Sequence, residues 1–261
     1  CAIVTGVQTC ALPICFEHVE PCDDYFRYMR RHPEKGVPMD HGLGQNQMEP
    51  VISTVSESNS LTHWTVDRSV DFLETRDTSR PFFLWTSFTK PHPPFDCDIN
   101  YWQLYQNRTM PEPVYGDWSQ RAEDVPEGFM RFIKSLNSCD RFTPEMLRDM
   151  RRAYYACITQ IDYNLGRLFS RLRELGQLEN TWIVFTSDHG ELLGDHFLAA
   201  KFLALEASAR VPFIIRAPGG GEWKHLRGSC SDELVTLADL LPTFAGIGGA
   251  EEIPDDIDGH D

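Results

Sequence analysis

The sequence predicts an α/β fold, with a largely parallel sheet that carries helices on both faces. Short apolar runs typical of buried strands alternate with segments of helical spacing, which is the order expected of a parallel sheet with crossover helices. The chain has 261 residues, of which 41% are hydrophobic and 24% charged. That is enough for one large domain, or two small ones, with a buried core. No apolar run approaches the roughly 18 residues needed to span a bilayer.

The N-terminal segment needs separate treatment. Val4–Ile14 resembles the translation of a common sequencing-library adapter, with a real apolar segment or the tail of a signal peptide as the alternative. The segment lacks the basic start and long apolar core of a signal peptide. We therefore expect residues 1–15 to be an artefact without structure. The five cysteines outside this segment form no CxxC pair and no zinc-binding spacing.

The first half of the chain is predicted to supply one helix and one buried strand. Residues 16–59 are polar and without a clear period, which predicts an irregular surface segment. An amphipathic helix is predicted over 61–75. Phe82–Phe88 is a continuous apolar run typical of a buried strand. Three prolines within 89–95 cannot continue a strand or a helix, so a rigid loop begins where this strand ends.

A long insertion and a long helix come next. Residues 96–142 are loop-like and aromatic, and we expect them to form the wall of a pocket, with a mobile excursion as the alternative. Thr143, Pro144 and Glu145 are a typical helix start. Apolar residues keep helical spacing from there until Gly176 ends the helix.

Two more strands, 181–186 and 211–216, are predicted from their apolar runs. A helix over 234–244 completes the pattern of alternating strands and helices. This order is the basis for the predicted fold class.

The net charge of the chain excludes some partners. Acidic residues outnumber basic ones by 39 to 24, which gives a formal charge of -15. This balance argues against nucleic acid and against an anionic membrane surface as general partners. A site for an anion in such a chain requires local positive charge, from a metal or from placed Lys, Arg or His side chains.

Ionisable residues follow two of the apolar strands. Lys90 and His92 come after the first, and Asp188 and His189 directly follow the second. In open α/β sheets, ligands bind outside the carboxyl ends of the strands. A carboxylate and an imidazole held there can reach one cation, and hard divalent cations prefer the carboxylate. Asp is also a common N-cap, so the pair alone leaves both interpretations open.

The surrounding motifs decide between them. Ser187–Glu191, Leu193–His196 and Lys201, about a dozen residues after His189, resemble the S-D-H-G-E/D, L-G-D-H and lysine pattern of the sulfatase family in the alkaline phosphatase superfamily. Lys90–Phe95 resembles the K-P-H-x-P-F loop of that family. Further resemblances follow in the family's order: Asp162–Gly166 to D-x-x-x-G, Val211–Gly219 to V-P-x-I-I-R-x-P-G, Val235–Thr243 to the D-L-x-P-T helix, and Asp258–Gly259 to the start of D-G-x-S-L.

This resemblance implies an alkaline-phosphatase-like fold and hydrolysis of a sulfate monoester, of a small molecule or a carbohydrate, by a formylglycine nucleophile with bound calcium. Asp188 and His189 are implied to ligate the metal. Lys201 is implied to bind sulfate and position the nucleophile. Lys90 is implied to contact sulfate as well, with an exposed loop lysine as the alternative. His92 is implied to bind sulfate or protonate the leaving oxygen, which suits a group that titrates near neutral pH. A cation and charged donors would stabilise the transferring group.

Parts of the family pattern are missing. No Cys or Ser stands in C/S-x-P/A-x-R, and Asp23-Asp24 does not follow an apolar strand as the family's first metal pair does. Residues 16–261 are therefore expected to be an incomplete catalytic domain that is inactive as written. Glu191, Asp195 and His196 are expected only to cap or brace their turn. A phosphonate or phosphate ester hydrolase of the same superfamily and a noncatalytic homologue stay open as alternatives.

Overall fold

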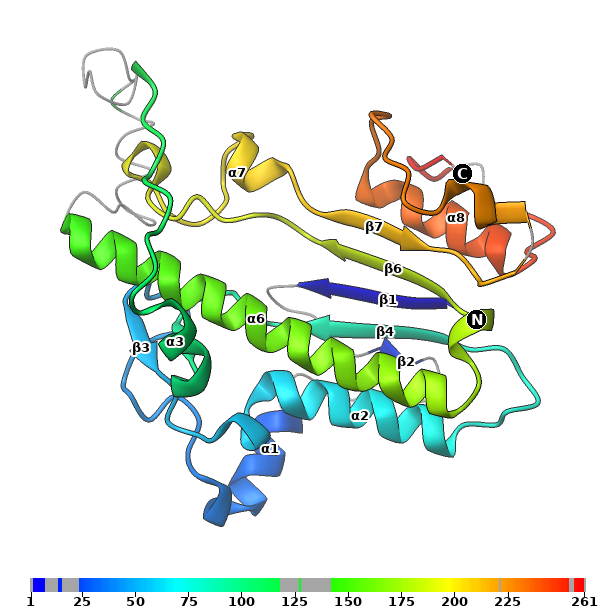
Figure 1. The fold of residues 1–261 in the computed structure, drawn as a ribbon, viewed down its shortest axis with the longest axis horizontal. Helices are drawn as coiled ribbons and strands as arrows, with labels where there is room; N and C mark the ends of the chain where they lie inside the picture. The colour runs from blue at the N-terminus through cyan, green and yellow to red at the C-terminus, as the bar shows by residue number, and fades with distance from the viewer. Residues whose placement is uncertain are drawn as a thin grey trace.

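A five-stranded sheet forms the centre of the molecule (Figure 1). The computed structural model describes residues 2–7, 14–15, 24–117, 127, 142–220, 222–253 and 256–260. Within this part, the strand order is β2-β4-β1-β6-β7, with bounds β1 Ala2–Val7, β2 Ile14–Cys15, β4 Phe83–Phe88, β6 Trp182–Ser187 and β7 Phe213–Arg216. β4, β1 and β6 run parallel, and β2 and β7 pair antiparallel at the two edges. The predicted α/β fold with a largely parallel sheet is confirmed.

β1 is the middle strand of this sheet. Its register places Val7 opposite Phe88 of β4 on one side and Ser187 of β6 on the other. The run is apolar and rich in β-branched residues, which suits a strand, and a strand in mid-sheet needs partners for its backbone on both sides. The expectation that residues 1–15 lack structure is therefore wrong for β1 and β2. That expectation rested on the nucleotide sequence that would encode the segment, whereas the formation of a strand depends on the amino acids themselves. The adapter origin itself stays a prediction.

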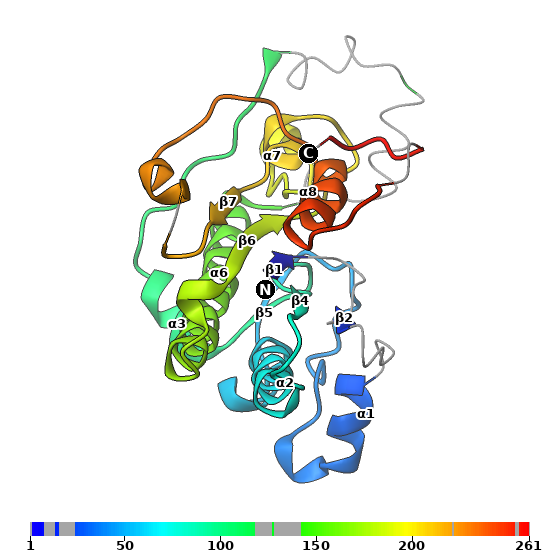
Figure 2. The same cartoon turned by 90° about the vertical axis from the view of Figure 1, so that its right-hand side faces the viewer.

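Helices lie on both faces of the sheet (Figures 1 and 2). α2 (Leu61–Thr75) and α6 (Pro144–Glu174) cover one face. There the main core forms from Val66, Leu73, Leu84, Phe88, Ile161, Leu165, Leu168, Leu172 and Ile183. α8 (Leu240–Ile247) lies against the other face, where Phe244 meets Phe83 edge to face at 5.3 Å.

The long helix α6 begins and ends as its sequence predicts. The Thr143 side chain accepts a hydrogen bond from the amide of Met146, so it caps the first turn. Gly176 takes a left-handed conformation with φ of 68°. Its amide donates to the carbonyl of Arg173, and the next amide donates to the carbonyl of Leu172, which is the Schellman closure of a helix.

Smaller elements surround this core. They are α1 Asp24–Arg31, β3 Pro50–Ile52, β5 Phe95–Cys97, α3 Ile99–Tyr105 and α7 Glu206–Ala209, with 3-10 turns at Pro33–Lys35, Glu57–Asn59, Leu178–Asn180, Asp195–Phe197, Glu222–Leu226 and Leu237–Asp239. β3 and β5 form a separate parallel pair. The structure thus corrects the prediction of an irregular segment over 16–59, because α1 buries Tyr25 and Met29 against Val55.

The remaining expected elements fare differently. The helix predicted from residue 234 starts only at Leu240, after a 3-10 turn capped by Thr236 and Asp239. The insertion 96–142 begins as β5 and α3, and most of its later part, 118–126 and 128–141, lies outside the described residues. Among the helices described, none is both long and apolar enough to cross a bilayer.

Candidate active site

A pocket opens beyond the carboxyl ends of β4 and β6. Both strands end level with Val7 of β1, which separates them, so their ends stand about 10 Å apart. The pocket has a volume of about 130 Å³ and is lined by Asn46, Met48, His92, Pro93, Glu191, Ala200, Lys201 and Phe202. His92 comes from the loop after β4, and Lys201 comes from the loop after β6. The structure therefore brings these two predicted residues into one cavity.

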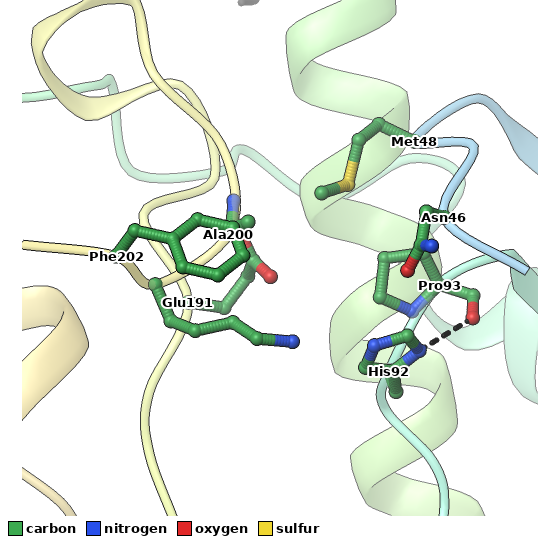
Figure 3. Close-up of a pocket in the computed structure, with 8 residues that line it drawn as sticks. Asn46, Met48, His92, Pro93, Glu191, Ala200 and Phe202 are labelled. Carbon is green, nitrogen blue, oxygen red and sulfur yellow. Dashed lines mark hydrogen bonds between the residues drawn. The ribbon is translucent and has the colours of Figure 1, made fainter. Parts of the chain in front are cut away.

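The pocket has two walls (Figure 3). His92 and Pro93 lie on one side together with Asn46 and Met48, and Glu191 and Phe202 lie opposite. The described residues of the insertion 96–142 are not among the lining residues, and the rest of it lies outside the described part of the chain, so the pocket wall expected from the insertion stays a prediction. Asn46 and Met48, from the segment 46–48, line the pocket beside His92. That segment is polar and aperiodic, and no sequence signal pointed to it.

His92 is held in one tautomer by its neighbour. Its Nδ1 lies 2.8 Å from the carbonyl oxygen of Pro93. Because a carbonyl can only accept, Nδ1 carries the proton and Nε2 is the nitrogen left to accept or transfer one. Burial lowers the pKa of His92, and the charges of Lys201 and Lys90 lower it further, while the Pro93 carbonyl opposes them. The imidazole is therefore biased toward its neutral form until an anion enters.

Asp188 and His189 directly follow β6. Asp188 Oδ1 accepts a hydrogen bond from the His189 amide at 3.0 Å. His189 Nδ1 donates to the carbonyl of Gly190 at 2.7 Å. Its Nε2 is buried without a hydrogen-bond partner and stands 3.5 Å from Asp188 Oδ2. A histidine that donates one ring N–H to a backbone carbonyl and keeps the other nitrogen bare is typical of a metal ligand.

The pair thus fits two ligands of a divalent cation. The Nε2 of His189, which has no hydrogen-bond partner, supplies one lone pair, and the neighbouring Asp188 carboxylate supplies an oxygen. Within the described ranges, no group of three or more His, Cys, Asp or Glu side chains could hold a metal by itself. The described residues therefore offer part of a coordination shell.

Glu191 connects the two ends of the loop that carries this chemistry. Its carboxylate accepts hydrogen bonds from the amides of Leu193, at 3.5 Å, and Ala200. Burial raises the pKa of Glu191 to about 7, against the opposing effect of these amides and of Lys201. The sequence predicted only a brace here. The structure shows the brace and also places Glu191 in the lining of the pocket.

The same loop is braced from outside by α6. The buried Arg151 donates from Nε to the Leu193 carbonyl at 3.0 Å and from Nη2 to Asp195 Oδ1 at 2.6 Å. Asp195 Oδ1 also accepts from the amide of Val114 at 2.9 Å, and the His196 amide donates to the Val114 carbonyl at 2.7 Å. The expected bracing role of Asp195 and His196 is confirmed. Four residues without glycine's freedom take positive φ in this loop: Leu193, His196, Phe197 and Ala200.

Lys90 does not line the pocket. Its ammonium donates to the Pro94 carbonyl at 2.6 Å, lies 3.5 Å from the His92 carbonyl, and forms an ion pair with Asp96. The structure therefore places this predicted sulfate ligand beneath the loop of His92 and apart from the cavity.

Comparison with known proteins gives the site a context. A family model described as Sulfatase matches residues 9–250. An arylsulfatase of Clostridium perfringens is 37% identical over 243 residues, which cover 92% of this chain and 49% of that protein. A choline-sulfatase of Rhizobium meliloti is 36% identical over 183 residues, 68% of this chain and 34% of that protein. The phosphonate monoester hydrolase of Agrobacterium radiobacter superposes with a TM-score of 0.72 at 27% identity, over 90% of this chain and 48% of that one. The chain thus spans about half the length of the Clostridium perfringens arylsulfatase and of the Agrobacterium radiobacter phosphonate monoester hydrolase.

Proposed function

Because this chain belongs to the sulfatase family, we propose that its pocket binds the oxyanion of a sulfate monoester, and that the whole protein hydrolyses such esters. The observation that carries the proposal is the meeting of His92 and Lys201 in one cavity. The two residues come from loops more than 100 positions apart. Lys201 gives an acidic chain the local positive charge that an anion site needs, and His92 adds a group that can take up a proton when the anion binds.

Lys201 would pair with the oxygens of the bound sulfate. A positioned ammonium stabilises negative charge that spreads over the transferring group. His92 would then take up a proton on Nε2, because the anion offsets the burial and the neighbouring cations that hold its pKa down. As an imidazolium it could donate that proton to the leaving alkoxide.

Asp188 and His189 would hold a divalent cation, for which calcium is our proposal. The bare Nε2 of His189 beside the Asp188 carboxylate supports this assignment. When bound, such a cation supplies Lewis-acid stabilisation of the charged group. The proposed nucleophile of the whole protein is a formylglycine. No Cys or Ser of this sequence stands in its motif, so we expect this chain to bind anions without turning esters over.

A second candidate is a phosphonate or phosphate monoester hydrolase. The superposition on a phosphonate monoester hydrolase favours it. A tetrahedral phosphoryl oxyanion accepts hydrogen bonds from the same donors as a sulfate does. Lys201 and His92 would play the same parts with either ester. The choice between the two candidates therefore rests on which anion the pocket prefers.

The test is calorimetric titration of the chain with inorganic sulfate, inorganic phosphate and methylphosphonate, in the presence of calcium. We expect sulfate to bind most tightly, and Lys201→Ala to weaken it by at least about tenfold, as loss of one charge-assisted contact does. The matched control is Lys224→Ala, which removes an exposed lysine far along the chain. Equal sulfate binding by the wild type and Lys201→Ala would refute the anion site, and preference for methylphosphonate would favour the second candidate.

A further inference from the structure

We propose that Lys90 is a positioning residue that sets His92 in place, and that it does not bind the substrate anion. The proposal rests on the proposed function only in its reference to His92 as an anion-binding group. Its own basis is the set of contacts around the Lys90 ammonium.

Those contacts use the whole donor capacity of the side chain. A lysine ammonium has three N–H donors. Three oxygen partners surround it: the carbonyls of Pro94 and His92, at 2.6 and 3.5 Å, and the carboxylate of Asp96. The Lys90 and Asp96 side chains are only 15% and 14% exposed. To bind a substrate anion, Lys90 would have to leave the largely buried Asp96 carboxylate without a counter-charge, which is strongly unfavourable.

The loop itself needs an external donor. Proline has no N–H, so Pro91, Pro93 and Pro94 contribute carbonyls but no donors to the turn. Among the described residues 89–95, one backbone bond lies within the turn, from the His92 amide to the Thr89 carbonyl, at 3.0 Å. Buried carbonyls must find a donor. Lys90 supplies it to the carbonyls on both sides of Pro93, and so closes the turn from which the His92 ring projects.

Asp96 ties this turn to the rest of the pocket. It lies on β5 between Phe95 and Cys97, both of which are fully buried in the core. Its Oδ2 stands 3.6 Å from Nε2 of His41, whose side chain is 4% exposed. His41 Nδ1 accepts from the Leu43 amide at 3.1 Å, so the proton of the neutral ring is on Nε2, facing Asp96.

The chain of groups His41, Asp96 and Lys90 therefore links the two segments that together form one wall of the pocket. At one end is the segment that supplies Asn46 and Met48, and at the other is the turn of His92. Removal of either member of the central ion pair should loosen the turn. Because both members act on the same geometry, their effects should not add.

The experiment compares four chains: wild type, Lys90→Met, Asp96→Asn and the double variant. The first readout is hydrogen exchange of the His92 amide, measured by NMR without any ligand. We expect exchange to be about tenfold faster in each single variant than in the wild type. In the double variant it should be no faster than in either single variant, as for groups acting as one unit. Amides in the middle of α2 should stay unchanged. Unchanged exchange at His92 in both single variants would overturn the proposal.

The second readout is the affinity for inorganic sulfate. Asp96→Asn removes a negative charge close to an anion site, so simple electrostatics predicts tighter binding. If Lys90 acts by positioning His92, Asp96→Asn should instead lower the sulfate affinity by about tenfold, and adding Lys90→Met to it should lower the affinity no further. Tighter binding by Asp96→Asn, together with an undiminished loss when Lys90→Met is added to it, would show that Lys90 contacts the anion directly.

Two results separate this proposal from the proposed function. If the wild-type chain binds no sulfate, the anion site fails, while the exchange readout still decides the role of Lys90. If Lys90→Met does not fold, the double variant keeps the test, since it removes both charges and leaves no buried carboxylate unpaired.

Discussion

Gly190 offers a sharp test of the geometry around the proposed cation ligands. A Cβ added at this position would stand 2.1 Å from the Ala207 carbonyl oxygen, whereas real Cβ contacts are essentially never under 3.0 Å. The obstacle is backbone, which cannot rotate away. Gly190 therefore permits a close approach between the turn after β6 and the segment at α7.

The cost of Gly190→Ala follows from what must move. The amide of Gly190 donates to the Ser208 carbonyl at 2.7 Å, and the amide of Glu191 donates to the Ala207 carbonyl at 2.8 Å. Loss of the two bonds costs about 0.5–1.5 kcal/mol each, and the steric overlap adds about 1–3 kcal/mol. We expect the free energy of unfolding to fall by about 2–6 kcal/mol, and Tm by roughly 5–15 °C.

Urea unfolding and the exchange rate of the Glu191 amide would measure the effect. The matched control is Gly166→Ala in the middle of α6, where an added Cβ meets nothing within 4 Å and should stabilise the helix by about 0.5–1 kcal/mol. A change of less than about 0.5 kcal/mol for Gly190→Ala, the usual range of a neutral surface substitution, would refute the close approach.

Four further predictions concern the same site. Arg151→Met should cost about 3–5 kcal/mol in urea unfolding, because it leaves Asp195 as a largely buried, unpaired charge; adding Asp195→Asn should recover part of that loss, and strict additivity would contradict the pairing. Sulfate affinity should fall as pH rises, by up to about tenfold per unit, because the free chain holds His92 neutral and the complex protonates it; calorimetry in buffers of different ionisation enthalpy would show proton uptake in the wild type and none in His92→Gln. Calcium should bind at most weakly, since the described residues offer two ligands, and His189→Ala should abolish that heat; unchanged heat would exclude the histidine. The purified chain should show no measurable turnover of an aryl sulfate, and any turnover that co-purifies with it would overturn the assignment of a missing nucleophile.

The sequence predicted those elements whose stabilising features lie within the element itself. The helix α6 was accessible from sequence because its cap, its apolar spacing and its terminal glycine all lie within the element. α1 was missed because its burial depends on Val55 and Trp64, which lie 24 or more residues further along the chain. β1 was missed because residues 1–15 were set aside as an adapter translation, although their apolar, β-branched side chains suit a strand.

The site divides in the same way. His92, Asp188 and His189 follow strand ends, where the topology itself concentrates ligand-binding side chains, whereas Lys201 was predicted from its spacing to His189 in the family resemblance. The position of the Lys90 ammonium depends on which oxygens its long side chain reaches in the folded chain, and no local sequence pattern indicates those partners. Asn46 and Met48 reach the pocket through the β3–β5 pair, a tertiary contact that no periodicity reveals.

The position of β1 also has a consequence for biosynthesis. Ala2 pairs with Phe83 and Trp182, so the strand at the centre of the sheet waits for partners made much later. At a translation rate of about 5–20 residues per second, β6 follows β1 by about 9–36 s. β4 follows β1 after only about 4–16 s at the same rate, so β1 can pair on one side early, and its second side stays unpaired until β6 is complete and the parallel part of the sheet can close.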